Sequence, residues 1–241
     1  MLNLVESFLS VQGEGKFSGK LAYFFRFAGC NLRCSGFKCE GKSQKTGEIL
    51  VGCDTINAVQ TSHFEYEKIS CANELIEKIP NLQNKPIIVI TGGEPLLHHA
   101  NEIFYEFIGE LLRQKYEVHF ETNGTINVNF SAFPLYKKCI FAISPKLKNS
   151  GETKQKRLNF VALLNLKRYA KDSFYKFVIS AKESENNEIK AILDICKNEV
   201  YCMPLGGNLG ELEKNAPKVA KFCIKNGYNY SDRLHIRISQ R

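Results

Sequence analysis

An α/β protein with a mainly parallel sheet is the fold that this sequence predicts, and three observations predict it. Short apolar runs alternate with segments of helical periodicity along most of the 241 residues. The runs are apolar almost throughout, as in strands that are buried on both faces. About six βα units follow one another, fewer than the eight of a closed barrel. We therefore expect one domain over residues 1–241, folded as a partial, open TIM-like barrel.

The predicted strands are short runs rich in apolar and aromatic residues, of which LAYFFRFAG is the first. Such residues favour a pleated, buried strand. The predicted strands cover 21–29, 86–90, 117–122, 139–144, 174–180, 199–203 and 233–238.

The predicted helices lie between these strands and show a period of 3.6 residues. The clearest is 101–115, where Phe104, Phe107, Ile108 and Leu111 share one face. The other predicted helices cover 72–79, 158–170, 187–197 and 211–226, and Gly227 closes the last of them.

The composition is that of a folded globular protein, with 44% hydrophobic and 24% charged residues. No stretch approaches the roughly 18 apolar residues of a membrane span. The first residues lack the basic region of a secretory signal and include Glu6. We expect a soluble, cytoplasmic protein without a membrane partner.

The net charge of +8 comes from 33 basic and 25 acidic residues spread along the chain. The densest basic patch, KLKNSGETKQKR at 146–157, has five positive charges and one negative. Charge runs are usually solvated loops, which is the favoured interpretation. A phosphate or RNA contact is the alternative, but no RNA-binding signature accompanies it, so we expect no nucleic-acid partner.

Nine cysteines are many for a chain of this kind, and they indicate metal or redox chemistry. Helical spacing and apolar neighbours predict that Cys139, Cys196 and Cys223 are core residues. Cys71 and Cys202 have no assigned role. The remaining four, Cys30, Cys34, Cys39 and Cys53, lie within 24 positions.

Unusual residues follow the predicted strands at their carboxyl ends, where α/β folds gather their chemistry. Cys30-Asn-Leu-Arg-Cys34 follows the first strand and Thr91-Gly-Gly-Glu-Pro the second. Paired zinc cysteines usually have two residues between them, whereas three separate this pair. Three thiolates on a four-iron cluster would leave one iron open to a small ligand.

This combination resembles the radical S-adenosylmethionine enzymes. The resemblance implies a [4Fe–4S] cluster held by three cysteines, with S-adenosylmethionine on the fourth iron and a 5′-deoxyadenosyl radical as the reagent. The protein would bind, orient and exclude water. Contacts to S-adenosylmethionine are implied for Gly52, Asp54, Gly92, Gly93, Glu94, Thr122, Asn123, Ser144, Pro145 and Lys146.

Further motifs resemble the 7-carboxy-7-deazaguanine synthase family. They are SVQGEG at 10–15, FRFAGCNL at 25–32, ETNGT at 121–125, SPK at 144–146 and KFV at 176–178. The resemblance implies conversion of 6-carboxy-5,6,7,8-tetrahydropterin to 7-carboxy-7-deazaguanine with loss of ammonia, on the route to queuosine and other 7-deazapurines. It also implies Mg²⁺ and, as partners, an electron donor such as flavodoxin or ferredoxin and a second copy of the chain in a homodimer.

The cysteine loop, about 30–55, departs from the family pattern. The family's Cys-Asp-Thr occurs here as Cys53-Asp54-Thr55, far beyond Cys34. We interpret 35–52 as an insertion, because loops tolerate added length at modest entropic cost. The cluster ligands are then Cys30, Cys34 and Cys53, with Cys39 as the rival for the third place.

The same resemblance assigns the magnesium and substrate residues. It implies that Thr55 binds Mg²⁺, with Asp54 as the second choice because hard oxygen ligands suit this ion. Arg26 offers a planar fork for the substrate carboxylate, and Gln12 and Glu14 suit a guanine-like edge. The predicted substrate contacts are Val11, Gln12, Gly13, Glu14, Arg26, Thr91 and His235, and no general acid or base is assigned.

The sequence also leaves two other functions open. One is an activase that takes hydrogen from a glycine of a partner protein. The other is a zinc-binding regulatory or RNA-binding module built on the four clustered cysteines.

Overall fold

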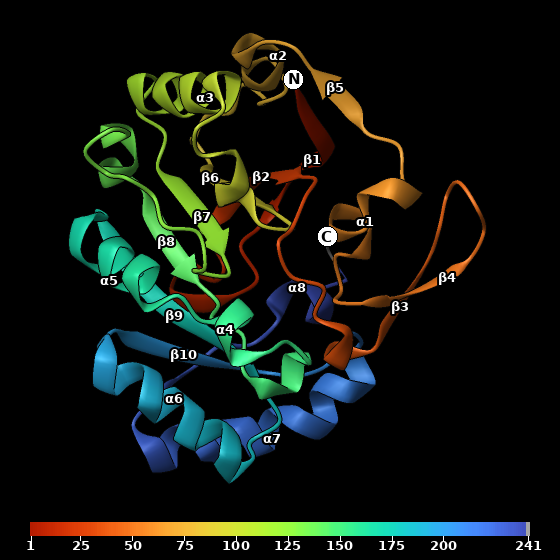
Figure 1. The fold of residues 1–241 in the computed structure, drawn as a ribbon, viewed down its shortest axis with the longest axis vertical. Coiled ribbons are helices and arrows are strands. Elements are labelled where there is room, and N and C mark those ends of the chain that lie inside the picture. The colour runs from red at the N-terminus through yellow and green to blue at the C-terminus, as the bar shows by residue number, and fades with distance from the viewer. Residues whose placement is uncertain (240–241) are drawn as a thin grey trace.

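The computed structural model describes residues 1–239 and contains a curved sheet of nine strands (Figure 1). The strands are β1 Leu2–Val11, β2 Leu21–Phe27, β5 Glu67–Ile69, β6 Ile87–Gly92, β7 Val118–Thr122, β8 Ile140–Ile143, β9 Asp172–Ile179, β10 Glu199–Pro204 and β11 Asn229–Tyr230. Their order is β11-β10-β9-β8-β7-β6-β2-β1-β5. Neighbours from β2 to β11 are parallel, whereas β1 is antiparallel to both β2 and β5. Since β5 and β11 do not pair with each other, the sheet stays open.

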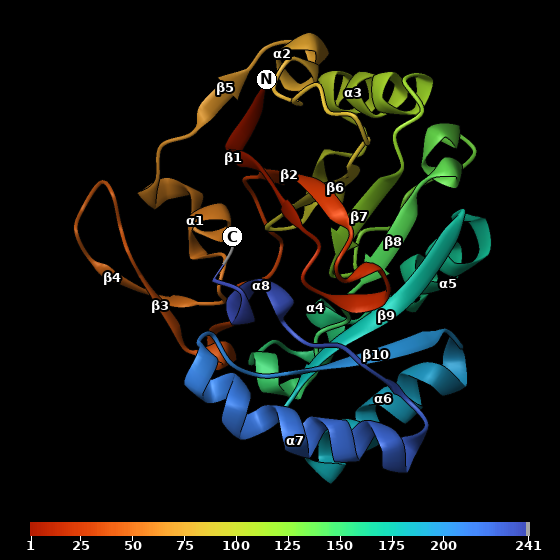
Figure 2. The ribbon, with the colours of Figure 1, turned by 180° about the vertical axis from the view of Figure 1, so that it is seen from behind.

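The helices are α1 Ile56–Val59, α2 Ala72–Ile76, α3 Glu102–Arg113, α4 Lys154–Arg157, α5 Phe160–Tyr169, α6 Glu183–Ile195, α7 Leu209–Asn226 and α8 Leu234–Arg237. The longer helices and α2 cover the outside of this sheet, whereas α1 lies beside the segment 39–52 and α8 near the centre, as both ribbon views show (Figures 1 and 2). The main core lies between the longer helices and the sheet, with Phe104, Leu163, Ile189 and Val219 among its members. Burial of these apolar faces is the main stabilising contribution to the fold.

The inner face of the sheet is covered by the loop between β1 and β2. Phe17 of this loop packs against Phe174, and its ring centroid lies 4.4 Å from that of His119. The same loop carries Gln12 and Glu14. Its packing against the sheet therefore fixes two predicted substrate residues.

The segment 35–52, which we interpreted as an insertion, contains a β-hairpin beside the main sheet. Its strands are β3 Cys39–Lys42 and β4 Ile49–Gly52, and Cys39 pairs with Gly52 in the antiparallel register. A hairpin returns the chain to its starting point, so Cys34 and Cys53 lie near its base despite their separation in sequence. The added length thus leaves the cysteine loop closed.

The predicted α/β fold with an open, mainly parallel sheet is confirmed. The prediction of a strand over 233–238 is wrong, because β11 ends at Tyr230 and Leu234–Arg237 is a short helix. The amide of Leu234 donates to the carbonyl of Gly13 instead of a sheet partner. The strand β1 was missing from the prediction, because its polar residues interrupt the apolar pattern.

The core cysteines were predicted correctly, since Cys139, Cys196 and Cys223 are buried. Cys202 is buried too, whereas Cys71 is exposed. None of the helices within residues 1–239 combines the length and apolar character needed to cross a membrane.

Candidate functional site

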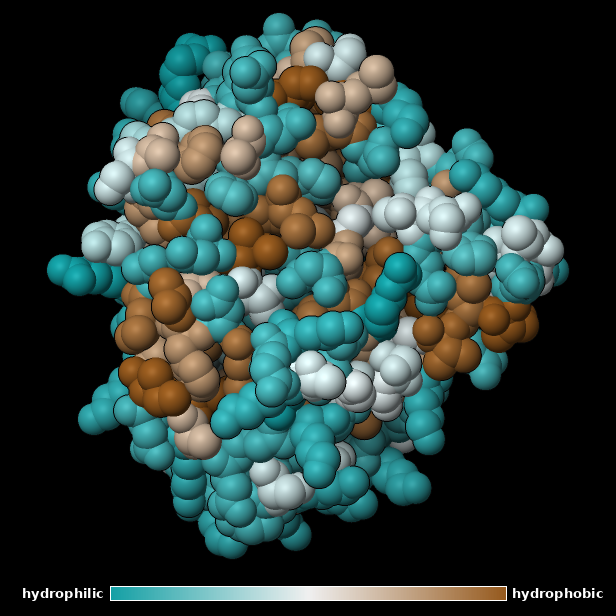
Figure 3. Space-filling view, in the orientation of Figure 1, coloured by the Kyte–Doolittle hydropathy of each residue, from teal (hydrophilic) through white to brown (hydrophobic). Residues whose placement is uncertain are grey.

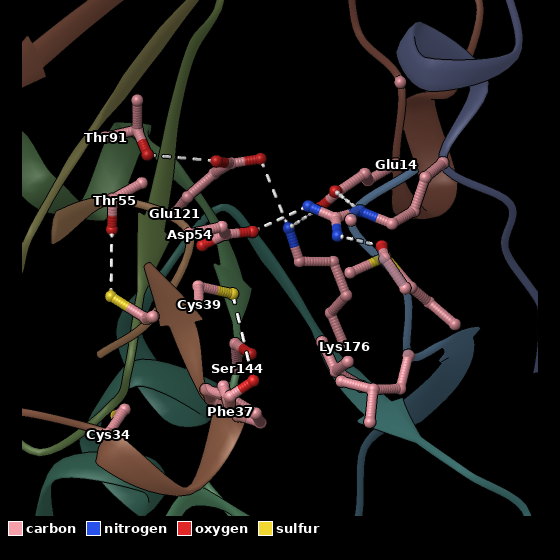
Figure 4. A pocket seen from close by; sticks show the side chains of 18 of the residues that line it. Glu14, Cys34, Phe37, Cys39, Asp54, Thr55, Thr91, Glu121, Ser144 and Lys176 are labelled. Atoms are coloured by element: carbon pink, nitrogen blue, oxygen red, sulfur yellow. Dashed lines mark hydrogen bonds and ion pairs between the residues drawn. The ribbon is translucent and has the colours of Figure 1, made fainter. Parts of the chain in front are cut away.

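A cavity of about 860 Å³ opens at the carboxyl ends of the parallel strands. Four strands of the parallel part of the sheet each contribute a polar side chain to it: Arg26 from β2, Thr91 from β6, Glu121 from β7 and Lys176 from β9. Arg26 and Thr91 are neighbours in the β2–β6 register. The cavity lies where parallel α/β sheets place their ligands, and Figure 4 shows its polar side chains pointing toward one another.

All four clustered cysteines line this cavity. Burial raises the pKa of the Cys30 thiol to about 12 and that of Cys34 to about 11, and the nearby thiol of Cys53 adds to both shifts. Within residues 1–239 no three His, Cys, Asp or Glu side chains already have the spacing of a metal site. The thiols must therefore rotate toward one another to hold a cluster, which a loop that places them in one cavity permits.

The Gly92–Gly93 turn packs directly against the backbone that precedes Cys30. A Cβ on Gly93 would overlap the carbonyl oxygen of Gly29, and one on Gly92, where φ is +144°, would overlap that of Phe27. The amide of Glu94 donates to the Gly29 carbonyl at 2.8 Å. Glycine is required here because the two backbones touch, so the turn positions the cysteine loop.

The carboxylate of Glu94 is buried behind this turn and does not line the cavity. It accepts hydrogen bonds from Thr122 Oγ1 at 2.8 Å and from the amides of Asn123 at 2.6 Å and Leu96 at 3.0 Å. Burial raises its pKa to about 6 despite these donors. In this structure Glu94 joins the turn after β6 to the turn after β7.

Other predicted S-adenosylmethionine contacts divide into two groups. The larger group lines the cavity and consists of Asp54, Gly92, Gly93, Thr122, Asn123, Ser144 and Lys146. Gly52 and Pro145 do not line it. The Asn123 amide group also donates to Asn31 Oδ1 at 3.0 Å, inside the cysteine loop. The turn after β7 is therefore tied to the loop that would carry the cluster.

A buried charge network occupies the opposite wall of the cavity. Lys176 Nζ lies 2.6 Å from Glu14 Oε2 and 3.3 Å from Glu121 Oε1. Thr91 Oγ1 donates to Glu121 at 3.0 Å, and Gln12 Nε2 donates to it at 3.4 Å. Burial opposes the charge of Lys176, but the two carboxylates outweigh it and raise its pKa. Burial likewise opposes the ionised Glu14, yet the nearby cations hold its pKa well below the usual range.

The C-terminal helix α8 brings Arg233 and His235 to the same wall. Arg233 Nε lies 3.2 Å from Glu14 Oε1, its Nη2 lies 2.7 Å from Asp54 Oδ2, and its Nη1 donates to the Gly206 carbonyl at 2.6 Å. His235 lines the cavity 4.0 Å from Glu14 Oε1, and burial lowers its pKa. A Cβ on Gly13 would overlap the His235 ring, so this loop and the helix fit only with glycine.

Arg26 has the definite partner that a cation within an apolar strand requires. Its Nε lies 2.9 Å from Glu6 Oε1 of β1, and the side chain lines the cavity. The Glu6 carboxylate thus already contacts the Arg26 guanidinium, which is predicted to bind the carboxylate of the substrate. Val11, Gln12 and Gly13 also line the cavity, next to Glu14.

The residues after Cys53 lie at the edge between the cysteines and the charge network. Thr55 Oγ1 is 3.3 Å from Cys53 Sγ and lines the cavity. Asp54, in contrast, is held by the Arg233 guanidinium. Figure 4 shows Thr55 and Asp54 on the same side of the cavity as the cysteines, facing Lys176 across it.

Three members of the network, Glu121, Lys176 and Arg233, had no role assigned from the sequence. Glu121 and Lys176 are charged residues within buried strands, a pattern that indicates a paired or functional group. That signal was present in the sequence. Arg233 carried no comparable signal, because it follows the last strand and its neighbours in space are distant in sequence.

Comparison with known proteins supports an iron–sulfur cluster in this chain. Residues 11–167 match the family described as a 4Fe-4S single cluster domain. A 7-carboxy-7-deazaguanine synthase of Hyperthermus butylicus is 30% identical, covering 99% of this chain and 93% of the relative. Another, of Halobacterium salinarum, is 29% identical and covers 98% of this chain and 90% of the relative.

The fold is also that of a solved member. The crystal structure of QueE from Escherichia coli matches with a TM-score of 0.64 at 20% identity, covering 97% of this chain and 94% of that one. The likeness extends over almost the whole length of both chains. The chain belongs to the 7-carboxy-7-deazaguanine synthase family and carries its 4Fe–4S single-cluster domain.

Proposed function

We propose that this protein is a radical S-adenosylmethionine lyase that converts 6-carboxy-5,6,7,8-tetrahydropterin to 7-carboxy-7-deazaguanine and releases ammonia. Family membership supports the reaction. The observation that carries the proposal is one cavity with two unlike walls. Its cysteine loop suits an iron–sulfur cluster, and its network of Glu14, Glu121 and Lys176 suits a polar heterocycle.

The cluster would be held by Cys30, Cys34 and Cys53, which line one side of the cavity. When bound, the cluster and S-adenosylmethionine supply the electron and the radical with which the reaction starts. The backbone of Gly92 and Gly93 and the side chains of Ser144 and Lys146 lie in the cavity where S-adenosylmethionine would be bound. Glu94 would contribute by fixing the turns, because its carboxylate already accepts three hydrogen bonds.

The substrate would lie against the charge network. Glu14 is held ionised by Lys176 and Arg233, so its carboxylate is a fixed acceptor for the N–H groups of a guanine-like ring edge. Gln12 is placed beside it, with its side-chain oxygen 3.0 Å from the Glu14 amide. Arg26, with Glu6 as its present partner, would bind the carboxylate of the substrate from the neighbouring strand.

Magnesium would be bound at the edge of the cysteine loop. Thr55 offers a hydroxyl to the cavity, whereas Asp54 is occupied by Arg233. Mg²⁺ needs only one or two protein ligands when substrate oxygens and water complete its octahedron. We therefore favour Thr55 over Asp54, and Thr55→Ala should weaken the magnesium dependence of turnover.

One anaerobic assay tests the reaction. The protein is reconstituted with iron and sulfide and supplied with S-adenosylmethionine, Mg²⁺, dithionite and 6-carboxy-5,6,7,8-tetrahydropterin, and products are identified by mass spectrometry. We expect 7-carboxy-7-deazaguanine that depends on S-adenosylmethionine. Cleavage of S-adenosylmethionine without this product would overturn the substrate, and zinc in place of iron would overturn the radical chemistry.

The choice of the third cysteine ligand has its own test. Cys53 immediately precedes Asp54 and Thr55 of the cavity edge, whereas Cys39 begins the inserted hairpin. We expect Cys53→Ala to lose the four-iron content and Cys39→Ala to retain it, as measured by iron analysis and electron paramagnetic resonance. The reverse result would assign the ligand to Cys39.

A further inference from the structure

The basic segment 146–157 does not lie in free solvent but packs against the cysteine loop. Glu152 Oε1 accepts hydrogen bonds from the amides of Arg33 at 2.6 Å and Cys34 at 3.2 Å. A Cβ on Gly36 would overlap the carbonyl oxygen of Asn149, so the two backbones touch. Both ribbon views show this contact, with the red-orange loop beside the green segment that leads into α4 (Figures 1 and 2).

Because of this contact, exposed cations of both segments lie on the outer side of the cysteine loop. We call the set formed by Arg33, Lys38, Lys148, Lys154 and Lys156 the basic rim, and all five residues are exposed. In the part of the chain that the structure describes, none of their side chains forms an ion pair, whereas other lysines do, such as Lys16 with Asp172.

The acids close to the rim are already engaged. Glu152 accepts from the loop amides, and Glu188 pairs with Arg157 at 2.7 Å. Hydrophilic side chains cover most of the face where α4 meets the cysteine loop (Figure 3). The rim therefore keeps an excess of positive charge, since the Glu152 carboxylate is the acid that faces Arg33 and Lys156, and such surfaces attract partners of opposite charge.

We propose that the basic rim is the docking surface for an acidic one-electron carrier protein, such as a flavodoxin. The proposal rests on the proposed function, because the electron would pass to the cluster of the neighbouring loop. Electron transfer slows steeply with distance, and the rim lies close to the cysteines, because the Glu152 carboxylate between Lys148 and Lys154 accepts a hydrogen bond from the amide of Cys34 at 3.2 Å. Arg33, Lys148, Lys154 and Lys156 do not line the cavity, so a carrier bound there leaves the substrate entrance open.

Charge complementarity sets the expected character of this complex. Steering by opposite charges speeds association more than it raises affinity, and electron-transfer complexes are small and short-lived. Binding should therefore weaken as salt is added. RNA would also respond to the charge, but the rim covers two short segments, 33–38 and 148–156, rather than the extended basic stripe that tracks a nucleic-acid backbone.

The experiment compares two triple variants with the same change in charge. The rim variant carries Lys148→Glu, Lys154→Glu and Lys156→Glu. The control carries Lys218→Glu, Lys221→Glu and Lys225→Glu, which are exposed on α7. Calorimetry measures binding of oxidised flavodoxin to the reconstituted enzyme at 50 and 300 mM salt. Stopped-flow absorbance then follows cluster reduction by reduced flavodoxin and, separately, by dithionite.

We expect the rim variant to bind flavodoxin at least tenfold more weakly than wild type and to accept its electrons at least tenfold more slowly. The control variant should match wild type, and all three proteins should be reduced equally by dithionite. Equal flavodoxin binding by the rim variant would overturn the proposal. So would a rim-dependent loss of binding to a tRNA probe with flavodoxin binding unchanged, which would assign the rim to nucleic acid. Failure of dithionite to support S-adenosylmethionine cleavage in wild type would instead defeat the proposed function.

Discussion

Lys176 is the residue that holds the substrate wall of the cavity together. It is buried between Glu14 and Glu121, and each carboxylate has a further donor, Arg233 for Glu14 and Thr91 for Glu121. A buried charge is tolerated when its partners are in contact, whereas loss of one partner leaves the other uncompensated. The energetic importance of this residue therefore exceeds that of any exposed lysine.

We predict that Lys176→Met lowers the free energy of unfolding by about 3 kcal/mol, as expected when a buried pair loses one partner. Lys171→Met is the matched control, since Lys171 is half-exposed and pairs with Glu117 at 3.3 Å. Its cost should stay below about 1 kcal/mol. Urea unfolding at pH 7 measures the free energy of unfolding of both variants. Equal losses would show that the buried network contributes no more to stability than an exposed ion pair.

Wild type and Lys176→Met also test how the stability of the fold depends on pH. The pKa of Glu14 is lowered in the folded state, so its stabilising contribution is present above the unfolded value of 4.5 and is lost as the pH falls through the folded value. Lys176→Met raises the folded pKa of Glu14 by removing a cation. The difference in stability between wild type and Lys176→Met should therefore narrow as the pH is lowered below 4.5.

Arg26 yields a prediction about recognition of the carboxylate. We expect Arg26→Ala to weaken binding of 6-carboxypterin about tenfold to a hundredfold, the effect of losing a charged hydrogen bond. Binding of pterin without the carboxylate should change little, as measured by calorimetry. Glu6→Gln removes the charge of the present partner of Arg26 and should not weaken the binding of 6-carboxypterin. An equal loss for both ligands in Arg26→Ala would refute a carboxylate-specific role.

Among the elements, the turn after β6 has the most direct effect on the cysteine loop. Its two glycines touch the backbone from Phe27 to Gly29, and Glu94 links it to the turn after β7. The inserted hairpin β3–β4 acts differently, because it only closes the loop at its base. Short elements thus decide where the cysteines lie, although the long helices provide most of the core.

Gly93→Ala tests this control of the loop. The added Cβ would overlap the Gly29 carbonyl oxygen and the loop must shift, so we expect the variant to incorporate less than half of the wild-type iron. Gly210→Ala is the matched control, because its Cβ would meet only Asn208 Oδ1 at an ordinary 3.6 Å. Iron analysis after reconstitution decides, and full incorporation by Gly93→Ala would refute a positioning role for the turn.

At the scale of the whole molecule, Arg233 joins segments from opposite ends of the chain. It contacts Glu14 of the β1–β2 loop, Asp54 of the cysteine loop and the Gly206 carbonyl after β10. The C-terminal helix α8 is thereby fixed over the cavity. The expected homodimer is a separate matter and stays a prediction.

We predict that Arg233→Gln lowers the free energy of unfolding by about 3 kcal/mol, since it breaks a buried pair, and speeds amide exchange at 229–238. Arg237→Gln is the matched control in the same segment, because the ion pair of Arg237 within residues 1–239 is a local one, with Asp232. Its cost should stay below about 1 kcal/mol. Hydrogen-exchange mass spectrometry reports the segment directly, and unchanged exchange in Arg233→Gln would show that α8 is held by other contacts.

The sequence by itself determined the α/β class, the parallel strands and the residues at their carboxyl ends. These follow from local patterns, because a buried strand must be apolar and the turn after it carries the polar groups. The pattern placed Cys30, Thr91 and Asn123 after predicted strands, and all three line the cavity at the strand ends.

Only the tertiary structure decided how the charged residues combine. The helix at 234–237 could not be told from a strand, since a short apolar run has no distinctive period and its backbone hydrogen bond to Gly13 joins the two ends of the chain. The buried position of Glu94 and the pairing of Glu14 with Lys176 and Arg233 are likewise contacts between segments far apart in sequence. Such pairings depend on distance in space, which a linear pattern does not contain.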